Sequence, residues 1–442
     1  LATAAHAADL GKNLAGETCH ASGATGQSLT IVCGSVSDAA GQVSTMPLGQ
    51  GIPADAAGRR TAIERLVSMS STEASCGDAQ WSGDVLLRIC TLKSSGWPRV
   101  LVARVVTGNL YRGEGIPSSL PVIEAAISAQ SGSLIPASQS RQVQQAMQAK
   151  LPNDGALASG ADYAGYQKSI EGARLAAAAD NYAAAETGYR NALSIEQRLF
   201  GVNSIVVGET LTELALQVSN QGRFSEAAAL FHRAGPIIEA SSDNGARARF
   251  DSYSALDAAN QRRYADALNF ARQATTARRA EIAAATQATA SADASGGATS
   301  SVSQGELAHD LRVQAAMALR VGDTAGARAA AEEALWIVSE EPGLPLWWRS
   351  DTVALMGEIN EQQGRVVAAE HDLRDARDLD VKLFGDTAPA ALSNLRLAEF
   401  YTRQQLYGPA MESYHLAFAV AQKDPVTRAQ IYPDDIVQFI AA

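Results

Sequence analysis

The chain has 442 residues, too many for one ordinary hydrophobic core, so several domains or an array of repeats are expected. Hydrophobic residues make up 46% of the sequence and aromatic residues only 6%, which favours many close-packed helices over a large β-sandwich. The net charge is −11 and the acidic excess follows residue 150, which argues against nucleic acid and anionic membranes as partners. No run of 18 apolar residues occurs, so no membrane span is predicted.

Residues 1–7 have the composition of the end of a secretory signal peptide. Ala5-His6-Ala7 matches the small-x-small pattern of a cleavage site, and no cysteine follows it directly to carry a lipid anchor. A disordered alanine-rich terminus is the alternative. The pattern predicts an exported protein, located in the periplasm, outside the cell or on the cell surface of a bacterium.

Four cysteines lie within the first hundred residues and favour the same location. Cys19 and Cys33 are 14 residues apart, as are Cys76 and Cys90, and the second cysteine of each pair lies in a strand-like run. Pairing within each unit would join each segment to its own strand, although four cysteines permit three pairings. A zinc site is the alternative, but no C-x2-C pair or histidine cluster accompanies them. We predict disulfides, which form in oxidising compartments.

A small α+β domain is predicted over residues 8–135, followed by a polar linker over 136–160. Glycine and serine turns separate the predicted elements of the domain. The strand-like runs are 28–33, 85–92 and 99–107, and the helical stretches are 59–69 and 117–129.

The sequence repeats over residues 161–423. The first residue after each predicted hairpin turn recurs at intervals of 42, 40, 60, 42 and 41 residues. Three and ten residues after each of these anchors the residue is alanine, and nine residues before it the residue is alanine or, once, glycine. Two antiparallel helices can approach closely where facing positions carry small side chains, so six stacked helical hairpins are predicted. The anchors are Tyr182, Phe224, Tyr264, Thr324, Val366 and Tyr407.

The one long interval contains a low-complexity insertion, residues 283–305. It predicts an extended second helix that frays into a mobile loop, with a docking or cleavage loop as the alternative. After the sixth hairpin, residues 424–442 are predicted to form a capping helix or the start of a further repeat.

These hairpins resemble tetratricopeptide repeats (TPR), and most of all the 42-residue form of kinesin light chains, whose second helix runs into a Leu-Phe-Gly turn. That turn is present as Leu199-Phe200-Gly201 and Leu383-Phe384-Gly385. The resemblance implies a mainly α fold: a right-handed α-solenoid of about six hairpins after the small disulfide-containing α+β domain, of the kind found in exported bacterial TPR proteins. Thr324 and Val366 depart from the pattern, because other repeats have an aromatic residue there.

No catalytic, cofactor or metal motif accompanies the repeats. The histidines lack metal spacing, and the nucleophile elbow, the P-loop, the zinc-protease helix and the dinucleotide fingerprint are missing from the sequence. The glycines of Gly108–Gly115 are interpreted as a turn between a strand and a helix, and the pair Glu332-Glu333 as a solvated helix surface. We predict a protein that is not an enzyme and needs no cofactor.

The first helices of TPR arrays line a concave groove that accepts peptides or helices, so the resemblance implies a protein or peptide partner. Ordinary helix-surface polarity is the alternative for each groove residue. Asn220 and Asn260 occupy equivalent positions, four residues before their anchors, as asparagines that hold a peptide backbone do. Trp347-Trp348 is predicted to plug a gap between repeats or to anchor a partner. The predicted groove residues are Glu209, Glu213, Asn220, Arg249, Tyr253, Asn260, Arg312, Glu358, Glu361, Arg396, Glu399 and Arg403.

Three functions fit this organisation. The first is a non-enzymatic scaffold in the bacterial envelope that binds a polypeptide in the groove. The second, by resemblance of architecture alone, is the regulatory or substrate-recruiting portion of a TPR-CHAT (caspase-like) protease whose catalytic domain would lie beyond residue 442. The third is a structural subunit that self-associates in a cell-surface assembly.

Overall fold

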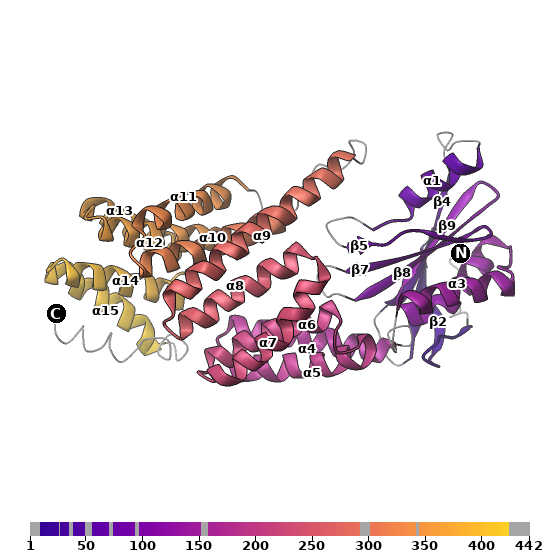
Figure 1. The fold of residues 1–442 in the computed structure, drawn as a ribbon, viewed down its shortest axis with the longest axis horizontal. Coiled ribbons are helices and arrows are strands. Elements are labelled where there is room, and N and C mark those ends of the chain that lie inside the picture. Colours follow the sequence, from indigo (N-terminus) through magenta and orange to yellow (C-terminus); the bar gives the residue numbers. More distant parts are fainter. Residues whose placement is uncertain are drawn as a thin grey trace, which may run out of the picture. The chain divides into compact units, whose positions relative to one another are not determined.

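The structure, a computed structural model, describes residues 9–25, 27–34, 39–48, 55–69, 74–92, 97–151, 158–291, 301–341 and 344–423. The predicted signal-peptide end (1–7) and the segment 424–442 lie outside these residues. The chain divides into two compact units, residues 1–242 and 243–442, which are described separately (Figure 1).

The first unit begins with an antiparallel sheet of strand order β1-β2-β3-β4-β9-β8-β7-β5, in which β6 pairs with β7. The predicted strand-like runs correspond to β3, β7 and β8. The strands are β1 (Asp9–Lys12), β2 (Thr18–Thr25), β3 (Ser28–Cys33), β4 (Ala39–Pro47), β5 (Ala74–Cys76), β6 (Gln80–Ser82), β7 (Val85–Leu92), β8 (Pro98–Val106) and β9 (Asn109–Gly115).

Helices cover both faces of this sheet. On one face, α2 (Leu120–Ser131) and α3 (Ala137–Lys150) share a core with alternate residues of β7 and β8, among them Leu87 and Val102. On the other face, α1 (Ala56–Leu66) packs against the intervening residues, such as Leu86 and Leu101. Because both faces are buried, the two central strands consist of nearly continuous apolar runs.

Two predictions for this region differ from the structure. Residues 136–160, expected as a linker, contain α3, whose Val143 and Met147 are buried in the core of the sheet. Gly108–Gly115, expected as a turn before a helix, is a hairpin turn followed by strand β9. A Cβ atom at Gly113 would overlap the side chain of Ile123, so glycine lets α2 lie directly on the strand.

The two predicted disulfides are present. Cys19 pairs with Cys33 across β2 and β3, and Cys76 pairs with Cys90 across β5 and β7, with Cα atoms 4.1 and 3.9 Å apart. No group of three or more histidine, cysteine, aspartate or glutamate residues within the described ranges could hold a metal ion, which disfavours the zinc alternative.

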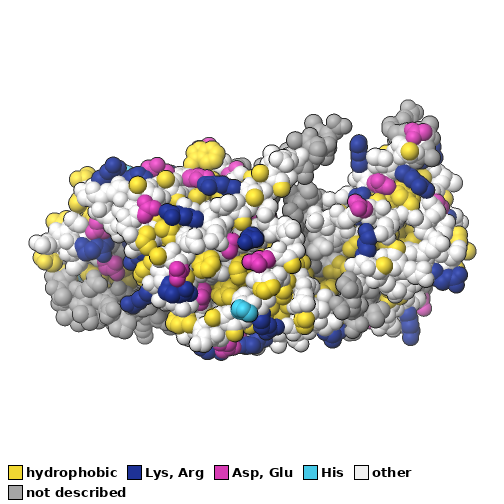
Figure 2. Space-filling model, viewed as in Figure 1, with side chains coloured by type: hydrophobic (Ala, Val, Ile, Leu, Met, Phe, Trp, Pro, Cys, Tyr) yellow, Lys and Arg dark blue, Asp and Glu magenta, His cyan; other side chains and the backbone are white. Residues whose placement is uncertain are grey.

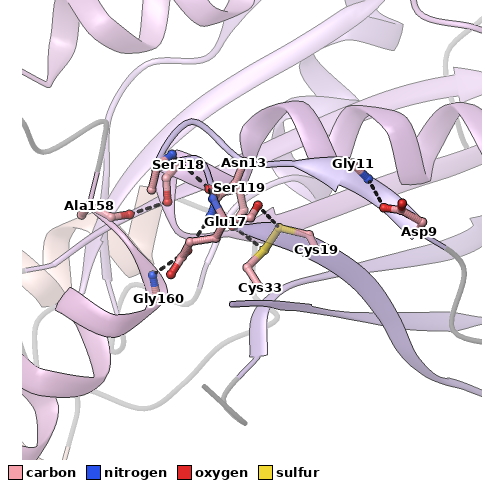
Figure 3. Close-up of a disulfide and its surroundings, with 11 residues drawn as sticks. Asp9, Gly11, Asn13, Glu17, Cys19, Cys33, Ser118, Ser119, Ala158 and Gly160 are labelled. Atoms are coloured by element: carbon pink, nitrogen blue, oxygen red, sulfur yellow. Dashed lines mark hydrogen bonds between the residues drawn. A yellow bond between two sulfur atoms is a disulfide. The ribbon is translucent and has the colours of Figure 1, made fainter. Parts of the chain in front are cut away.

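The sheet joins the first helical hairpin through a polar clasp beside the first disulfide (Figure 3). The Glu17 carboxylate accepts hydrogen bonds from Asn13 Nδ2 (2.7 Å) and from the Gly160 amide (3.1 Å) at the start of the next helix. A carboxylate at that position also interacts favourably with the helix dipole. The Trp97 ring is buried against Tyr166, 5.0 Å between centroids, which extends the contact into the hairpin.

Six helical hairpins follow in the described residues. Each consists of a first and a second helix joined by a tight turn. In the first unit these are α4 (Gly160–Ala178) with α5 (Tyr182–Phe200), and α6 (Ile205–Asn220) with α7 (Phe224–Ser241). In the second unit they are α8 (Asn244–Asn260) with α9 (Tyr264–Ser291), α10 (Ser301–Arg320) with α11 (Thr324–Glu340), α12 (Leu346–Gln362) with α13 (Val366–Phe384), and α14 (Ala388–Arg403) with α15 (Tyr407–Lys423).

The predicted repeat register is confirmed. Each of the six anchors is the first residue of a second helix, and every small residue of the pattern is buried. At the one glycine, Gly357, a Cβ atom would lie 2.8 Å from Cγ of Leu373, which shows how closely the two helices approach. The two Leu-Phe-Gly turns end α5 and α13 as expected. The chain therefore has the predicted mainly α fold of TPR-type hairpins after a small disulfide-containing domain.

All six hairpin turns have the same backbone form. The residue two before each anchor has a positive φ, and the next amide donates to the carbonyl five residues earlier, as in the Schellman motif. Glycine occupies this position in three turns. The other three have Asp180, Arg262 and Gln405, at φ values of 55°, 58° and 60°. L-residues are strained in this conformation, so these turns are held by the packing of their helices.

The predicted insertion, 283–305, overlaps two helices: α9 extends to Ser291, and α10 begins at Ser301. The residues between them lie outside the described ranges. Arg278 of α9 is buried among three carboxylates, with its Nη1 atom 2.8 Å from Glu281 and its Nε atom 3.2 Å from Asp310 of α10. Burial raises the pKa of Asp310 to about 6, against the opposing effect of Arg278.

Trp347 and Trp348 begin α12 with their rings at 87° to each other. Trp348 packs against the core shared by α10 and α11, as a plug would, whereas Trp347 is 44% exposed. None of the helices in the described ranges has the length and hydropathy needed to cross a bilayer.

Candidate functional site

The second unit contains two adjoining hollows along its first helices. We call the first, of about 410 Å³, the charged hollow and the second, of about 290 Å³, the apolar hollow. They share Glu358 and Arg396, and together they form what we call the groove. The charged hollow is also lined by Leu319, Arg320, Glu361, Gln362, Leu373, Glu399 and Arg403. The apolar hollow is also lined by Leu256, His309, Arg312, Val313, Ala316, Met317, Asp351, Ala354 and Leu355.

The repeat register explains why these side chains meet. Glu358 and Glu399 both lie eight residues before the anchor of their hairpin, and Arg320 and Arg403 lie four residues before theirs. Residues four apart share one face of a helix, and equivalent positions of successive first helices lie next to one another in a stacked array.

The apolar hollow combines an aliphatic floor with a cationic rim. Arg312 lies 2.9 Å from Asp351, and Arg396 lies 3.9 Å from the other oxygen of the same carboxylate. Burial lowers the pKa of Arg312, while Asp351 opposes this effect. Two guanidinium groups thus face one carboxylate, which leaves one positive charge in excess.

His309 reaches solvent at the edge of this hollow while protein surrounds the rest of its ring. Loss of solvation, followed by the positive charges of Arg312 and Arg278, lowers the pKa of His309 to about 4. The imidazole is therefore neutral at pH 7 and does not add to the positive charge of the rim.

The charged hollow is built around Arg403. Its Nε and Nη2 atoms lie 3.0 and 2.9 Å from the two oxygens of Glu361, and its Nη1 atom lies 3.5 Å from Glu399. The hydrogen bond with Glu361 raises the pKa of Arg403, and the charges of Glu399 and Glu358 add to this rise. Within the described residues, no direct hydrogen bond or ion pair engages Glu358.

The structure brings six of the predicted groove residues together: Arg312, Glu358, Glu361, Arg396, Glu399 and Arg403. Three others, Arg249, Tyr253 and Asn260, lie on α8 of the same unit but do not line either hollow. The remaining three, Glu209, Glu213 and Asn220, lie on α6 of the first unit, where Glu213 is buried 3.4 Å from Arg174.

Sequence reasoning missed several residues that complete the groove. Asp351 and His309 each lie fifteen residues before an anchor, so the register could have placed them on the same face. Leu256, Met317 and Leu355 form part of the floor, and a search for polar side chains could not find them.

No family model matches the chain, and the search of curated proteins found no match. Solved structures do match. One is the crystal structure of Podosopora anserina putative kinesin light chain nearly identical TPR-like repeats, at 15% identity over 49% of this chain and 94% of that chain, with a TM-score of 0.38. A Rap protein complexed with competence and sporulation factor is 13% identical over 70% of this chain and 85% of its own, with a TM-score of 0.42. Residues 1–338 of the assembly chaperone of RpL4 are 16% identical over 62% and 94%, also with a TM-score of 0.42.

Proposed function

We propose that this protein is a non-enzymatic scaffold that binds a polypeptide segment along the groove. The observation that carries the proposal is the pair of adjoining hollows, one with an aliphatic floor and one lined by charges of both signs, sharing Glu358 and Arg396. A polypeptide can present an apolar side chain and charged side chains in succession, and recognition by first-helix faces is a common use of helical repeats.

The distribution of charge supports a polypeptide over a polyanion. Glu358, Glu361 and Glu399 line the charged hollow and would repel phosphate or sulfate groups. Figure 2 shows positive and negative side chains interspersed with hydrophobic ones on the visible face, without a continuous basic stripe. We therefore expect no measurable binding of DNA or heparin at physiological salt.

A displayed library of random 12-residue peptides provides the test, because the natural partner is unidentified. Peptides selected on the whole protein would be labelled with fluorescein and titrated by fluorescence anisotropy. We expect Arg396→Glu to weaken their binding at least tenfold, since it replaces an attraction by a repulsion at a residue shared by both hollows.

Matched controls reverse charges on second helices. Arg233→Glu on α7 and Glu412→Lys on α15 change exposed residues that do not line the groove. Both should bind the selected peptides as the unchanged protein does. A library that yields no binder, or binders whose affinity is the same for all three variants, would contradict the proposed function.

We also propose that the protein works in an oxidising compartment of the bacterial envelope. The two cross-strand disulfides support this location, because such bonds persist outside the reducing cytosol. Fractionation of the native host, with non-reducing peptide mapping of the protein from each fraction, tests it. Recovery from the cytosol with four free thiols would contradict it.

A further inference from the structure

The groove has an electrostatic polarity. At the apolar hollow, Arg312 and Arg396 share the single carboxylate of Asp351. At the charged hollow, three carboxylates face the guanidinium groups of Arg403 and Arg320. One end therefore has an excess of positive charge, and the other has an excess of negative charge.

These excess charges are available to a ligand. Asp351 lies a full ångström closer to Arg312 than to Arg396, and the Arg396 side chain is 43% exposed. Glu358 is partly buried and makes no direct hydrogen bond or ion pair with any described residue. An opposite charge placed next to either group would gain more than it does in open water, because part of the solvent is already excluded there.

The aliphatic floor adds a third requirement. Leu256, Met317 and Leu355 line the hollow whose rim is formed by Arg312 and Arg396, so an apolar side chain that enters it passes next to the positive end. Its neighbour on the other side then meets Glu358. In an extended segment, alternate side chains on one face recur about every 7 Å, which allows one segment to reach all three subsites.

We propose that the groove selects a segment in which an apolar residue is flanked by an acidic residue on one side and a basic residue on the other. The acidic side chain pairs with Arg396 and Arg312, and the basic side chain pairs with Glu358 and Glu399. This inference rests on the proposed function, since it specifies the chemistry of the polypeptide that the groove accepts. A segment with two acidic or two basic flanks would place one like charge against an end of the groove.

Four labelled peptides of one common frame test the selection. They carry Asp-Ala-Leu-Ala-Lys, Asp-Ala-Leu-Ala-Asp, Lys-Ala-Leu-Ala-Lys or Asp-Ala-Ala-Ala-Lys at the centre of a Gly/Ser frame, and are titrated against the whole protein by anisotropy. The first should bind best. Each like-charged peptide should bind about three- to tenfold more weakly, and the leucine-free peptide about tenfold more weakly.

Charge reversals in the protein provide the decisive comparison. Glu358→Arg should make the Asp/Asp peptide the preferred ligand, and Arg396→Glu should make the Lys/Lys peptide the preferred ligand. Glu399→Arg, which changes the same end of the groove as Glu358→Arg, is the second variant should the first fail to fold, as judged by circular dichroism. Glu412→Lys should leave the order of the four peptides unchanged.

The outcomes separate this inference from the proposed function. If library-selected peptides depend on Arg396 while the four designed peptides bind equally, or while none of them binds, the groove binds polypeptides but the charge rule is wrong. The same conclusion follows if Glu358→Arg and Arg396→Glu weaken all peptides without changing their order. If neither the designed nor the selected peptides depend on Arg396, the proposed function itself fails.

Discussion

Replacing Glu196 with glutamine should stabilise the protein, and the gain should grow as the pH rises. Glu196 lies on α5 of the first unit with no exposed surface, and its Oε1 atom accepts a hydrogen bond from Thr210 Oγ1 at 2.8 Å. Burial raises the pKa of this carboxyl group to about 8, and the negative charges of Glu213 and Glu209 add to the rise, while the hydrogen bond from Thr210 opposes it. The side chain is therefore mostly protonated and neutral at pH 7.

The sign of the effect follows from proton linkage. An unfolded glutamate has a pKa of about 4.5, so between about pH 4.5 and 8 the folded protein holds a proton that the unfolded chain has lost. In this window the free energy of unfolding of the unchanged protein falls as the pH rises, by about 1.4 kcal/mol per pH unit from this group. Glutamine is neutral in both states and keeps an acceptor for Thr210, so Glu196→Gln removes that loss.

Urea unfolding of the whole protein at pH 5.5, 6.5 and 7.5, followed by circular dichroism and tryptophan fluorescence, measures the difference. We expect the stability of Glu196→Gln relative to the unchanged protein to increase by about 2–3 kcal/mol between the first and last pH. Glu412→Gln, an exposed carboxyl group on α15, serves as the control and should give a constant difference. A constant difference for Glu196→Gln as well would refute the reasoning.

Three further predictions concern the repeat and the disulfides. Ala227→Leu should lower the free energy of unfolding by about 1–3 kcal/mol or more, because it overpacks a buried helix crossing, whereas Ala229→Leu on the exposed side of the same helix should be nearly silent; equal melting shifts would be evidence against the register. Arg262→Gly should stabilise by about 0.5–1 kcal/mol in urea unfolding, since glycine adopts φ of 58° without strain, and a loss of stability would show that the Arg262 side chain matters more than its backbone. Replacing both Cys19 and Cys33 by serine should cost about 2–5 kcal/mol, and an unchanged denaturation midpoint would mean that this bond contributes little.

The helical hairpins could be predicted from sequence because their determinants are local. An alanine three residues into a second helix and another seven residues later lie on one face, and both must be small for the partner helix to approach. The N-terminal sheet could be predicted only in part, because its pairings are not local. Strand β4 pairs with β9, which joins residues 41–47 to residues 109–115. Helix α3 escaped prediction because a polar sequence with two buried side chains, Val143 and Met147, has too weak an apolar period.

Half of the candidate groove followed from the same register, and the other half did not for two physical reasons. The aliphatic floor, including Met317 and Leu355, has the composition of any helix–helix contact, so sequence alone cannot distinguish a side chain that lines a hollow from one that fills a gap. The role of Asp351 depends on partners 39 residues before it and 45 residues after it, on α10 and α14. Only the spacing of three successive first helices brings these groups within ion-pair distance.

Positions that build the hairpins and positions that line the groove are subject to different physical constraints. At Ala369 or Gly357 the neighbouring helix leaves no room for added atoms, so the side chain is fixed by packing. At Arg396 the side chain is partly exposed, and an exposed ion pair contributes at most about 1 kcal/mol to stability. A charge can therefore be reversed in the groove with little effect on the fold while the potential that a ligand meets changes sign. A loss of peptide binding with unchanged helix content can for this reason be attributed to recognition.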